Sequence, residues 1–398
     1  MAEKGYIRSL DGVRAIAIIL VMSFHTFITA FGWIGVQLFF VLSGFLITGI
    51  LWHEKDKPAP LSYKFKKFWI RRSLRIFPLY YCYLLVLAII YLFFHFPSYF
   101  PLFFPYAVSY TANFPLTLMH THGNPLFNHL WSLSVEEQFY VLFPLILLLA
   151  PKRLIRFLLP AIVILSPLLR YILGAWYEST GYSQKMAADA VNFNTFCQLD
   201  AFCTGGLIHI FSLDTRIKRP WLLFGTVAVL TVTAGLFTFA VSPSIPGEHW
   251  WLDWGFYHYY TNTGQHVWHY TCLNILSASL ILAMVRETRL EQPSLVRRLL
   301  ENKWMVNIGR VSYGMYIYHW LLWAYVFVVL FRPVSYPFKV LLFIPYVLFV
   351  YGFAELSYRL FEVRFIRLKD KFFPAAKRSP LPATEKEDGP HLENSLGV

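Results

Sequence analysis

"GVRAIAIILVMSFH", residues 12–25, is an apolar stretch with one arginine near its start and a histidine at its end. Apolar runs of about 20 residues recur along the chain, and this is the length of helix that crosses a lipid bilayer. The 398 residues are 57% hydrophobic and only 14% charged, whereas about 25% of the residues in a soluble domain are charged. The sequence therefore predicts an all-α integral membrane protein.

The apolar runs predict a bundle of about ten transmembrane helices. Their expected ranges are 13–31, 34–52, 74–96, 138–150, 155–174, 196–212, 221–242, 268–286, 311–331 and 339–362. A further apolar segment near 98–119 contains three prolines that would interrupt a helix, so we expect it to be re-entrant or interfacial. The transmembrane domain is predicted to cover residues 1–370, followed by a polar, disordered cytoplasmic tail at 371–398.

The lysines and arginines lie mainly on one side of the predicted bundle. If the N-terminus is inside, the inner segments hold 30 of the 35 basic residues, which is the asymmetry that the positive-inside rule describes. Both termini are therefore predicted to be cytoplasmic. The same distribution explains the net charge of +13 without a nucleic-acid partner. We interpret the first span as an anchor, not a cleaved signal peptide, because a second span follows almost at once.

Arg14 and His25 lie on one face of the first predicted helix. Their separation of eleven positions corresponds to about three helical turns and about 16 Å along the axis. Taken singly, Arg14 fits an inner-face anchor, and His25 fits a buried histidine bonded to a neighbouring helix. Together on one face they favour a functional site, because polar groups in hydrocarbon are costly.

Two further arginines, Arg72 and Arg75, lie one helical turn apart in "RRSLRIFPLYY", at the inner end of the third predicted span. Arginine side chains bind phosphate groups through paired hydrogen bonds, so this pair fits the docking of a cytoplasmic ligand that carries phosphates. The pair could equally well be two more arginines that anchor the inner face of the membrane, in a loop that is rich in basic residues. The residues alone leave both interpretations open.

The stretch "NHLWSLSVEEQFY", residues 128–140, opens the fourth predicted span on the outer side. Ser134 and Glu137 fit a capping box, which would give Glu137 a structural role. Glu136 has no such explanation, and an unpaired carboxylate at the rim of the apolar region is costly. We expect its partner to be His25, which reaches the same half of the membrane. A carboxylate that orients an imidazole is a familiar general-base arrangement.

Other polar groups leave their roles open. Ser312, Tyr316 and His319 lie along one stripe of the ninth predicted span, and Asp200 is an acid within the sixth. Hydrogen bonds between helices would explain them as well as a function would. The outer loop 248–270 has nine aromatic residues and no lysine or arginine, a composition that suits an interfacial belt or a surface that stacks on sugars.

Six segments, in this order, resemble the membrane-bound acyltransferase family 3, whose members acylate extracytoplasmic carbohydrates. They are "SLDGVRAIAIILVMSFH", "GVQLFFVLSGFLI", "RRSLRIFPLYY", "LWSLSVEEQFY", "QLDAFCTGG" and "VSYGMYIYH". The resemblance places the family's Arg-x10-His pair on Arg14 and His25. It places the family's third-helix arginines on Arg72 and Arg75, and its paired acids on Glu136 and Glu137.

The resemblance implies an O-acyltransferase of the cytoplasmic (inner) membrane that uses acetyl-CoA or another acyl-CoA as donor and a polysaccharide or lipid-linked sugar as acceptor. The residues expected to bind acyl-CoA are Arg14, Arg72 and Arg75. The expected catalytic residues are His25, as general base, with Glu136 and Glu137. Contacts to the oxyanion or the acceptor are expected from Ser132, Tyr313 and His319. We expect no metal and no permanently bound cofactor.

The sequence departs from the family pattern in two ways. The closing segment is usually Glu-Lys-Pro-Phe, but residues 362–365 read Glu-Val-Arg-Phe, so no role is carried to them. Many relatives append an SGNH hydrolase-like domain, and this chain is expected to act without one or with a separate partner.

The rival function is that of a transporter or flippase that uses the intramembrane His, Glu and Arg groups. A monomer and a homodimer both fit the sequence.

Overall fold

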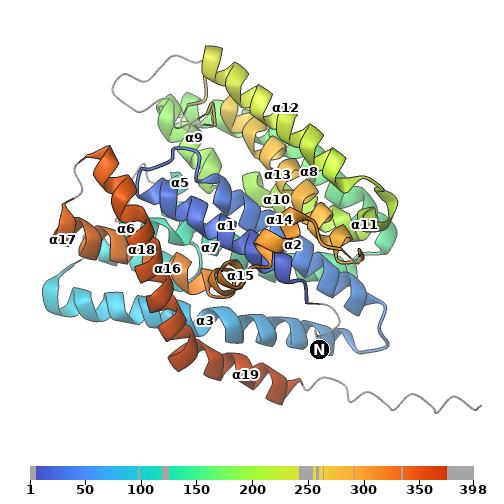
Figure 1. Ribbon diagram of the computed structural model, residues 1–398, viewed down its shortest axis with the longest axis horizontal. Coiled ribbons are helices and arrows are strands. Elements are labelled where there is room, and N and C mark those ends of the chain that lie inside the picture. Colours follow the sequence, from blue (N-terminus) through green and yellow to red (C-terminus); the bar gives the residue numbers. More distant parts are fainter. Residues whose placement is uncertain are drawn as a thin grey trace, which may run out of the picture.

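The computed structural model describes residues 6–96, 99–118, 125–241, 254–256, 260–262, 264–290, 292–332 and 335–373, and every regular element in this part of the chain is helical (Figure 1). The α-helices are α1 Arg8–His25, α2 Ile34–Lys55, α3 Leu61–Phe94, α4 Phe100–Val108, α5 Asn113–Leu118, α6 Pro125–Asn128, α7 Leu130–Leu149, α8 Lys152–Ser179, α9 Gln184–Phe193, α10 Thr195–Ile210, α11 Leu213–Arg216, α12 Pro220–Val241, α13 Gln265–Glu287, α14 Leu295–Leu300, α15 Lys303–Arg310, α16 Ser312–Leu322, α17 Val328–Phe331, α18 Tyr336–Ser357 and α19 Val363–Phe372. Two π-helical turns, Trp323–Phe327 and Tyr358–Glu362, join α16 to α17 and α18 to α19.

Eight helical stretches among the described residues are long and apolar enough to cross a membrane, which confirms the predicted all-α membrane protein. They are Ile34–Lys55, Leu61–Phe94, Leu126–Leu149, Lys152–Ser179, Pro220–Val241, Gln265–Glu287, Ser312–Phe331 and Tyr336–Leu368. The other two predicted spans, 13–31 and 196–212, correspond to α1 and α10. Helix α1 carries three charged residues, and α10 has only 16 residues, so the count of ten stays a prediction.

Helices α1, α2, α7 and α10 form the centre of the bundle, with α3 and α18 on one side and α8, α12 and α13 on the other (Figure 1). Two glycines allow helices to approach at backbone distance. A Cβ atom on Gly44 of α2 would lie 2.0 Å from the carbonyl oxygen of Phe202 in α10. A Cβ atom on Gly309 of α15 would lie 1.8 Å from the carbonyl oxygen of Asp11 in α1. Small residues at these contacts fix α1 and α2 against their neighbours.

The proline-containing segment near 98–119 forms two short helices, α4 and α5, both too short to cross a membrane. Tyr110 lies between them with a φ of 53°. The hydroxyl of Tyr80 donates to the carbonyl of Ala107 at 2.8 Å, so this segment packs against α3. The predicted interruption is confirmed, whereas its depth in the membrane stays a prediction.

Several basic segments predicted to be cytoplasmic contact one another or adjoining turns. Lys152 pairs with Asp56 at 2.7 Å, and Arg286 donates to the carbonyl of Asp214 at 2.8 Å. These contacts are consistent with one basic end of the bundle, although the orientation in the membrane stays a prediction. Helix α19 extends two residues past the predicted end of the membrane domain at residue 370. The rest of the predicted tail, from residue 374, lies outside the described residues.

Candidate active site

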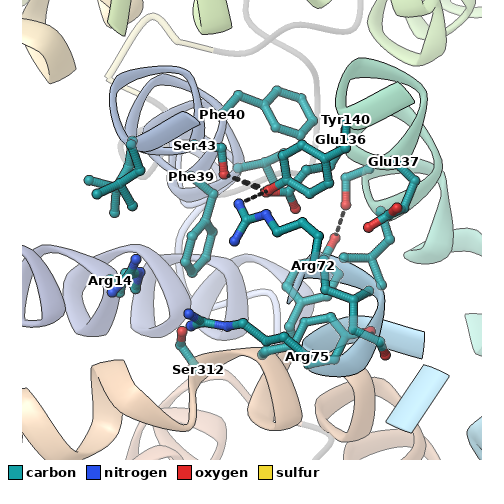
Figure 2. A pocket seen from close by; sticks show the side chains of 18 residues that line it. Arg14, Phe39, Phe40, Ser43, Arg72, Arg75, Glu136, Glu137, Tyr140 and Ser312 are labelled. Atoms are coloured by element: carbon teal, nitrogen blue, oxygen red, sulfur yellow. Dashed lines mark hydrogen bonds between the residues drawn. The ribbon is translucent and has the colours of Figure 1, made fainter. Parts of the chain in front are cut away.

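A pocket lies among α1, α2, α3, α7 and α16 and contains about 830 Å³ of empty space, counting its open mouth (Figure 2). Seven of the nine predicted site residues line it. They are Arg14, Arg72, Arg75, Ser132, Glu136, Glu137 and Tyr313. Residues from five separate parts of the sequence therefore meet around one space.

The two arginines of α3 differ in their bonding. The guanidinium of Arg72 donates to the hydroxyl of Tyr140 at 2.8 Å and lies 4.3 Å from the centre of that ring. Its Nε is buried without a partner among the described residues. Arg75 lies one turn further on and extends toward Ser312 in Figure 2. It is exposed in the pocket, and within the described part of the chain it makes no hydrogen bond or ion pair.

The third arginine, Arg14, has a counter-charge. Its guanidinium forms an ion pair with Asp11, which lies one turn earlier in α1 and is buried. The hydroxyl of Tyr6 donates to the same carboxylate. Arg14 therefore presents a partly neutralised charge to the pocket, whereas the side chain of Arg75 remains available for an anionic ligand.

The two glutamates of α7 also differ. Glu136 accepts hydrogen bonds from the hydroxyls of Ser43 and Tyr140. Glu137 is buried, and its Oε1 has no hydrogen-bond partner among the residues that the structure describes. The predicted capping box is wrong, because α7 begins at Leu130 and the hydroxyl of Ser134 donates to the carbonyl of Leu130 at 3.0 Å. A cap therefore does not account for Glu137, which instead lines the pocket.

His25 is half-buried at the end of α1 and is not among the residues that line the pocket. Its Nδ1 lies 2.8 Å from Nε2 of His319, and its ring packs on Trp320 with 5.0 Å between centroids. The prediction that Glu136 or Glu137 orients His25 is wrong, because His319 occupies that position. His319 was predicted to contact the oxyanion or the acceptor, and the structure makes it the partner of His25.

Tyr316 is common to the pocket and to the histidine pair. It lines the pocket together with Ser132, and the two hydroxyls are hydrogen-bonded to each other. Its ring centroid lies 5.4 Å from that of His319, and its hydroxyl donates to the carbonyl of His129 at 3.0 Å. The pocket therefore reaches to within one side chain of His319.

Sequence reasoning missed two groups that shape the pocket. Ser43 and Tyr140 hold Glu136, and Tyr140 also holds Arg72. The position of Tyr140, one turn after Glu136 on the same helix face, is a signal that could have identified it. Of the predicted contacts, Tyr313 is already engaged, since its hydroxyl donates to the carbonyl of Ile76 at 3.0 Å.

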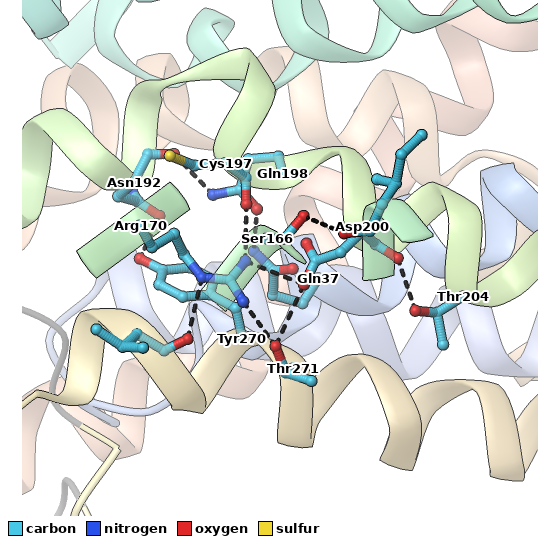
Figure 3. Close-up of polar contacts among 12 residues, drawn as sticks. Gln37, Ser166, Arg170, Asn192, Cys197, Gln198, Asp200, Thr204, Tyr270 and Thr271 are labelled. Atoms are coloured by element: carbon cyan, nitrogen blue, oxygen red, sulfur yellow. Dashed lines mark hydrogen bonds and ion pairs between the residues drawn. The ribbon is translucent and has the colours of Figure 1, made fainter. Parts of the chain in front are cut away.

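A second charged cluster lies in the other half of the bundle (Figure 3). Arg170 of α8 is completely buried and pairs with Asp200 of α10 at 3.0 Å. Its guanidinium also donates to the carbonyls of Cys197 and Val267 at 2.8 and 3.0 Å, and to the hydroxyl of Thr271 at 2.6 Å. All three of its nitrogens are therefore satisfied. Of the two roles left open for Asp200, this geometry favours the structural one.

The aromatic segment 248–270, predicted to be an outer loop, lies only partly within the described residues. In that part the indole of Trp33 donates to the carbonyl of Phe256 at 2.8 Å. Residues 248–253, 257–259 and 263 lie outside the described ranges. The expected acceptor surface therefore stays a prediction.

The family model described as an acyltransferase domain matches residues 7–355, which is most of the chain. The peptidoglycan O-acetyltransferase OatA of Listeria monocytogenes is 37% identical over 161 residues, which cover 38% of this chain and 25% of that protein. A Staphylococcus aureus (strain COL) protein, provisionally named an O-acetyltransferase, is 27% identical over 382 residues, which cover 90% of this chain and 57% of that protein. The chain thus spans little more than half the length of that relative. No solved structure matches the chain.

Proposed function

The chain belongs to the acyltransferase family whose model it matches, and from that premise we propose that it transfers an acetyl group from acetyl-CoA to a hydroxyl group of a carbohydrate outside the cytoplasm. The observation that carries the proposal is the pocket in which Arg14, Arg72 and Arg75 meet. Coenzyme A carries several phosphate groups, and arginine matches phosphate geometry through two parallel hydrogen bonds. The relatives named above supply acetyl as the acyl group and a hydroxyl as the acceptor.

In this proposal the phosphates bind at Arg72 and Arg75, which lie at the end of α3 predicted to be cytoplasmic. The pantetheine arm then extends through the bundle toward His25. Arg14 and His25 are about 16 Å apart along α1, a span that such an arm bridges. Apolar side chains that line the pocket, such as Phe39 and Phe40, would limit the access of water to the thioester.

His25 acts as the general base in the proposed reaction. Its free nitrogen takes the proton of the acceptor hydroxyl while the hydroxyl oxygen attacks the thioester carbonyl carbon. The tetrahedral intermediate then collapses, the carbon–sulfur bond breaks, and the departing thiolate takes the proton from the imidazolium. The products are the acetyl ester of the carbohydrate and free coenzyme A, so atoms and charges balance. The hydroxyl of Ser132 is the candidate for stabilising the oxyanion, because the hydroxyl hydrogen of Tyr316 is donated to the carbonyl of His129.

The rival function, transport or flipping of a sugar-containing substrate, is not favoured. Membership of an acyltransferase family supports group transfer. Arg170 is completely buried, and each of its guanidinium nitrogens donates to Asp200, a carbonyl or a hydroxyl, so this cluster does not resemble an open path for a substrate or a proton.

The test is acetyl transfer by the purified full chain in liposomes. Acetyl-CoA labelled in the acetyl group is supplied from one side, and a panel of peptidoglycan fragments, polysaccharides and lipid-linked sugars from the other. We expect label on a glycan, with loss of transfer in His25→Ala at an unchanged thermal unfolding midpoint. Transfer that persists undiminished in folded His25→Ala would refute the base role, and absence of label on every acceptor would refute the proposed reaction.

A further inference from the structure

The geometry of the histidine pair leads to an inference that deepens the proposed function and rests on it. We propose that His319 is a positioning residue that fixes the tautomer of His25, so that Nε2 of His25 carries the lone pair that accepts the substrate proton. In many enzymes a carboxylate fulfils this task for a histidine base. Here a second imidazole, itself oriented by a peptide carbonyl, replaces the carboxylate.

The first step concerns the proton on His319. Its Nδ1 lies 2.6 Å from the carbonyl oxygen of Tyr316, three residues earlier in α16. A carbonyl oxygen can only accept a hydrogen bond, so Nδ1 of His319 must carry the hydrogen. The oxygen has two lone pairs, which lets it accept this bond in addition to a helical N–H. A neutral imidazole has a single N–H, and Nε2 of His319 is then a bare acceptor.

The surroundings of His319 favour this neutral form. The side chain is completely buried. The titratable groups that face it are His25 of α1, at 4.9 Å between ring centroids, and His129, at 5.4 Å. Tyr346 of α18 donates its hydroxyl to the carbonyl of His319 at 2.9 Å, and Tyr316 packs on the ring. None of these groups is a carboxylate, and an uncompensated buried charge is costly.

The second step transfers this constraint to His25. Nε2 of His319 lies 2.8 Å from Nδ1 of His25. Because Nε2 of His319 is an acceptor, Nδ1 of His25 must be the donor. The single N–H of neutral His25 is therefore on Nδ1, and Nε2 has the lone pair. The fold thus selects one of two tautomers through a chain of two hydrogen bonds that ends on the backbone of α16.

A matched pair of variants tests the role of His319. In His319→Gln the side-chain amide reaches the position of Nε2 and can still accept from His25. In His319→Asn the shorter amide reaches only the position of Nδ1 and keeps the bond to the Tyr316 carbonyl. We expect His319→Gln to retain acetyl transfer within about tenfold of the wild type and His319→Asn to lose about a hundredfold, at similar thermal unfolding midpoints. Equal activities of the two folded variants would overturn the proposal.

A second measurement does not depend on activity. Nitrogen-15 NMR of histidine-labelled wild-type protein distinguishes a protonated ring nitrogen from a bare one, and the spectrum of His25→Gln assigns the His25 signals. We expect Nδ1–H and bare Nε2 for His25. A His25 ring with its hydrogen on Nε2 would overturn the proposal. If the expected tautomer is found but no acceptor becomes acetylated, the proposed reaction fails while the tautomer assignment stands.

Discussion

The arginines of this membrane bundle fall into two regions that use the same side chain differently. Arg170 is sealed from solvent, and each of its guanidinium nitrogens is bonded to Asp200, a carbonyl or a hydroxyl (Figure 3). Arg75 extends into a pocket without a hydrogen bond or ion pair in the described part of the chain (Figure 2). The first arrangement satisfies the charge within the protein. The second leaves it to be satisfied by a ligand.

The difference provides a physical criterion for reading charges inside a membrane protein. An arginine in hydrocarbon is costly wherever it lies, and the cost falls when its donors are bonded. A fully bonded arginine such as Arg170 needs no further explanation than stability. An arginine that the fold holds in a cavity without a direct ion pair among the described residues indicates an anionic substrate, and this is why we assign Arg75 to the donor.

The largest effect is expected in the sealed region. Asp200→Ala leaves Arg170 buried with an uncompensated charge, and such losses destabilise a protein by about 3–5 kcal/mol. Thermal unfolding in detergent micelles should show a midpoint far below that of the wild type. The double variant Arg170→Met/Asp200→Leu should recover most of the loss, because it removes both charges together. An unchanged midpoint in Asp200→Ala would remove the distinction between the two regions.

In the pocket, Arg75→Ala should weaken acetyl-CoA binding without lowering stability. A hydrogen bond to a charged group contributes about 1.5–3 kcal/mol, which corresponds to about a 10- to 100-fold change in Kd. Binding of labelled acetyl-CoA to purified protein measures it. Arg71→Ala is the matched control, because Arg71 is on the same helix but donates to the carbonyl of Phe373 at 3.4 Å. Donor affinity equal to wild type in Arg75→Ala would refute the docking model.

A buried carboxyl outside the membrane spans extends the comparison to the opposite charge. Burial raises the pKa of Asp189, in α9, from 3.8 to about 7, and Lys185 opposes this change. The folded state therefore holds a proton that the unfolded chain has released between about pH 4 and pH 7. Stability should fall as the pH rises through this window and level off above it.

The variant Asp189→Asn should lose this pH dependence. A one-unit change in pKa corresponds to about 1.4 kcal/mol, so the variant should be more stable than the wild type at pH 8 by at least about that amount. Unfolding midpoints measured from pH 5 to pH 8 check it. Parallel pH profiles of wild type and variant would show that Asp189 ionises as it does in water.

The smallest effect is expected at Tyr140, which bonds both Arg72 and Glu136. Tyr140→Phe removes one hydroxyl, and a typical hydrogen bond contributes about 1 kcal/mol, so the Kd for acetyl-CoA should rise about fivefold. Tyr81→Phe is the control, since that hydroxyl donates to the carbonyl of Val108 at 3.0 Å away from the pocket. Equal affinities for the two variants would mean that Tyr140 does not help to place Arg72.

Much of this architecture could be predicted from the sequence, because membrane helices follow from the length of apolar runs. The helical spacing also placed Arg72 and Arg75 on one face, and the structure finds both in one pocket. The start of α7 was less accessible to sequence reasoning. The motif at Ser134 and Glu137 resembles a cap, but the helix had already begun one turn earlier.

The contacts that define the histidine pair could not be predicted. His25 and His319 are 294 positions apart in the sequence, and nothing in either segment specifies which polar group of another helix it will meet. Glu136 illustrates the same limit, because its partner Ser43 lies in a different helix. Periodicity determines which face a residue occupies, whereas tertiary packing determines what that face contacts.

The backbone contact between α2 and α10 has a mechanical consequence. Gly44 touches the backbone of Phe202, and the amide of Gln37 donates to that of Gln198 at 2.7 Å, so sliding of α2 along α10 would break these contacts. These contacts hold the wall of the pocket that carries Ser43 against α10. We therefore expect any widening that admits a bulky coenzyme to come from displacement of the opposite wall, formed by α3 and α16, and spin labels across these two walls would register that motion.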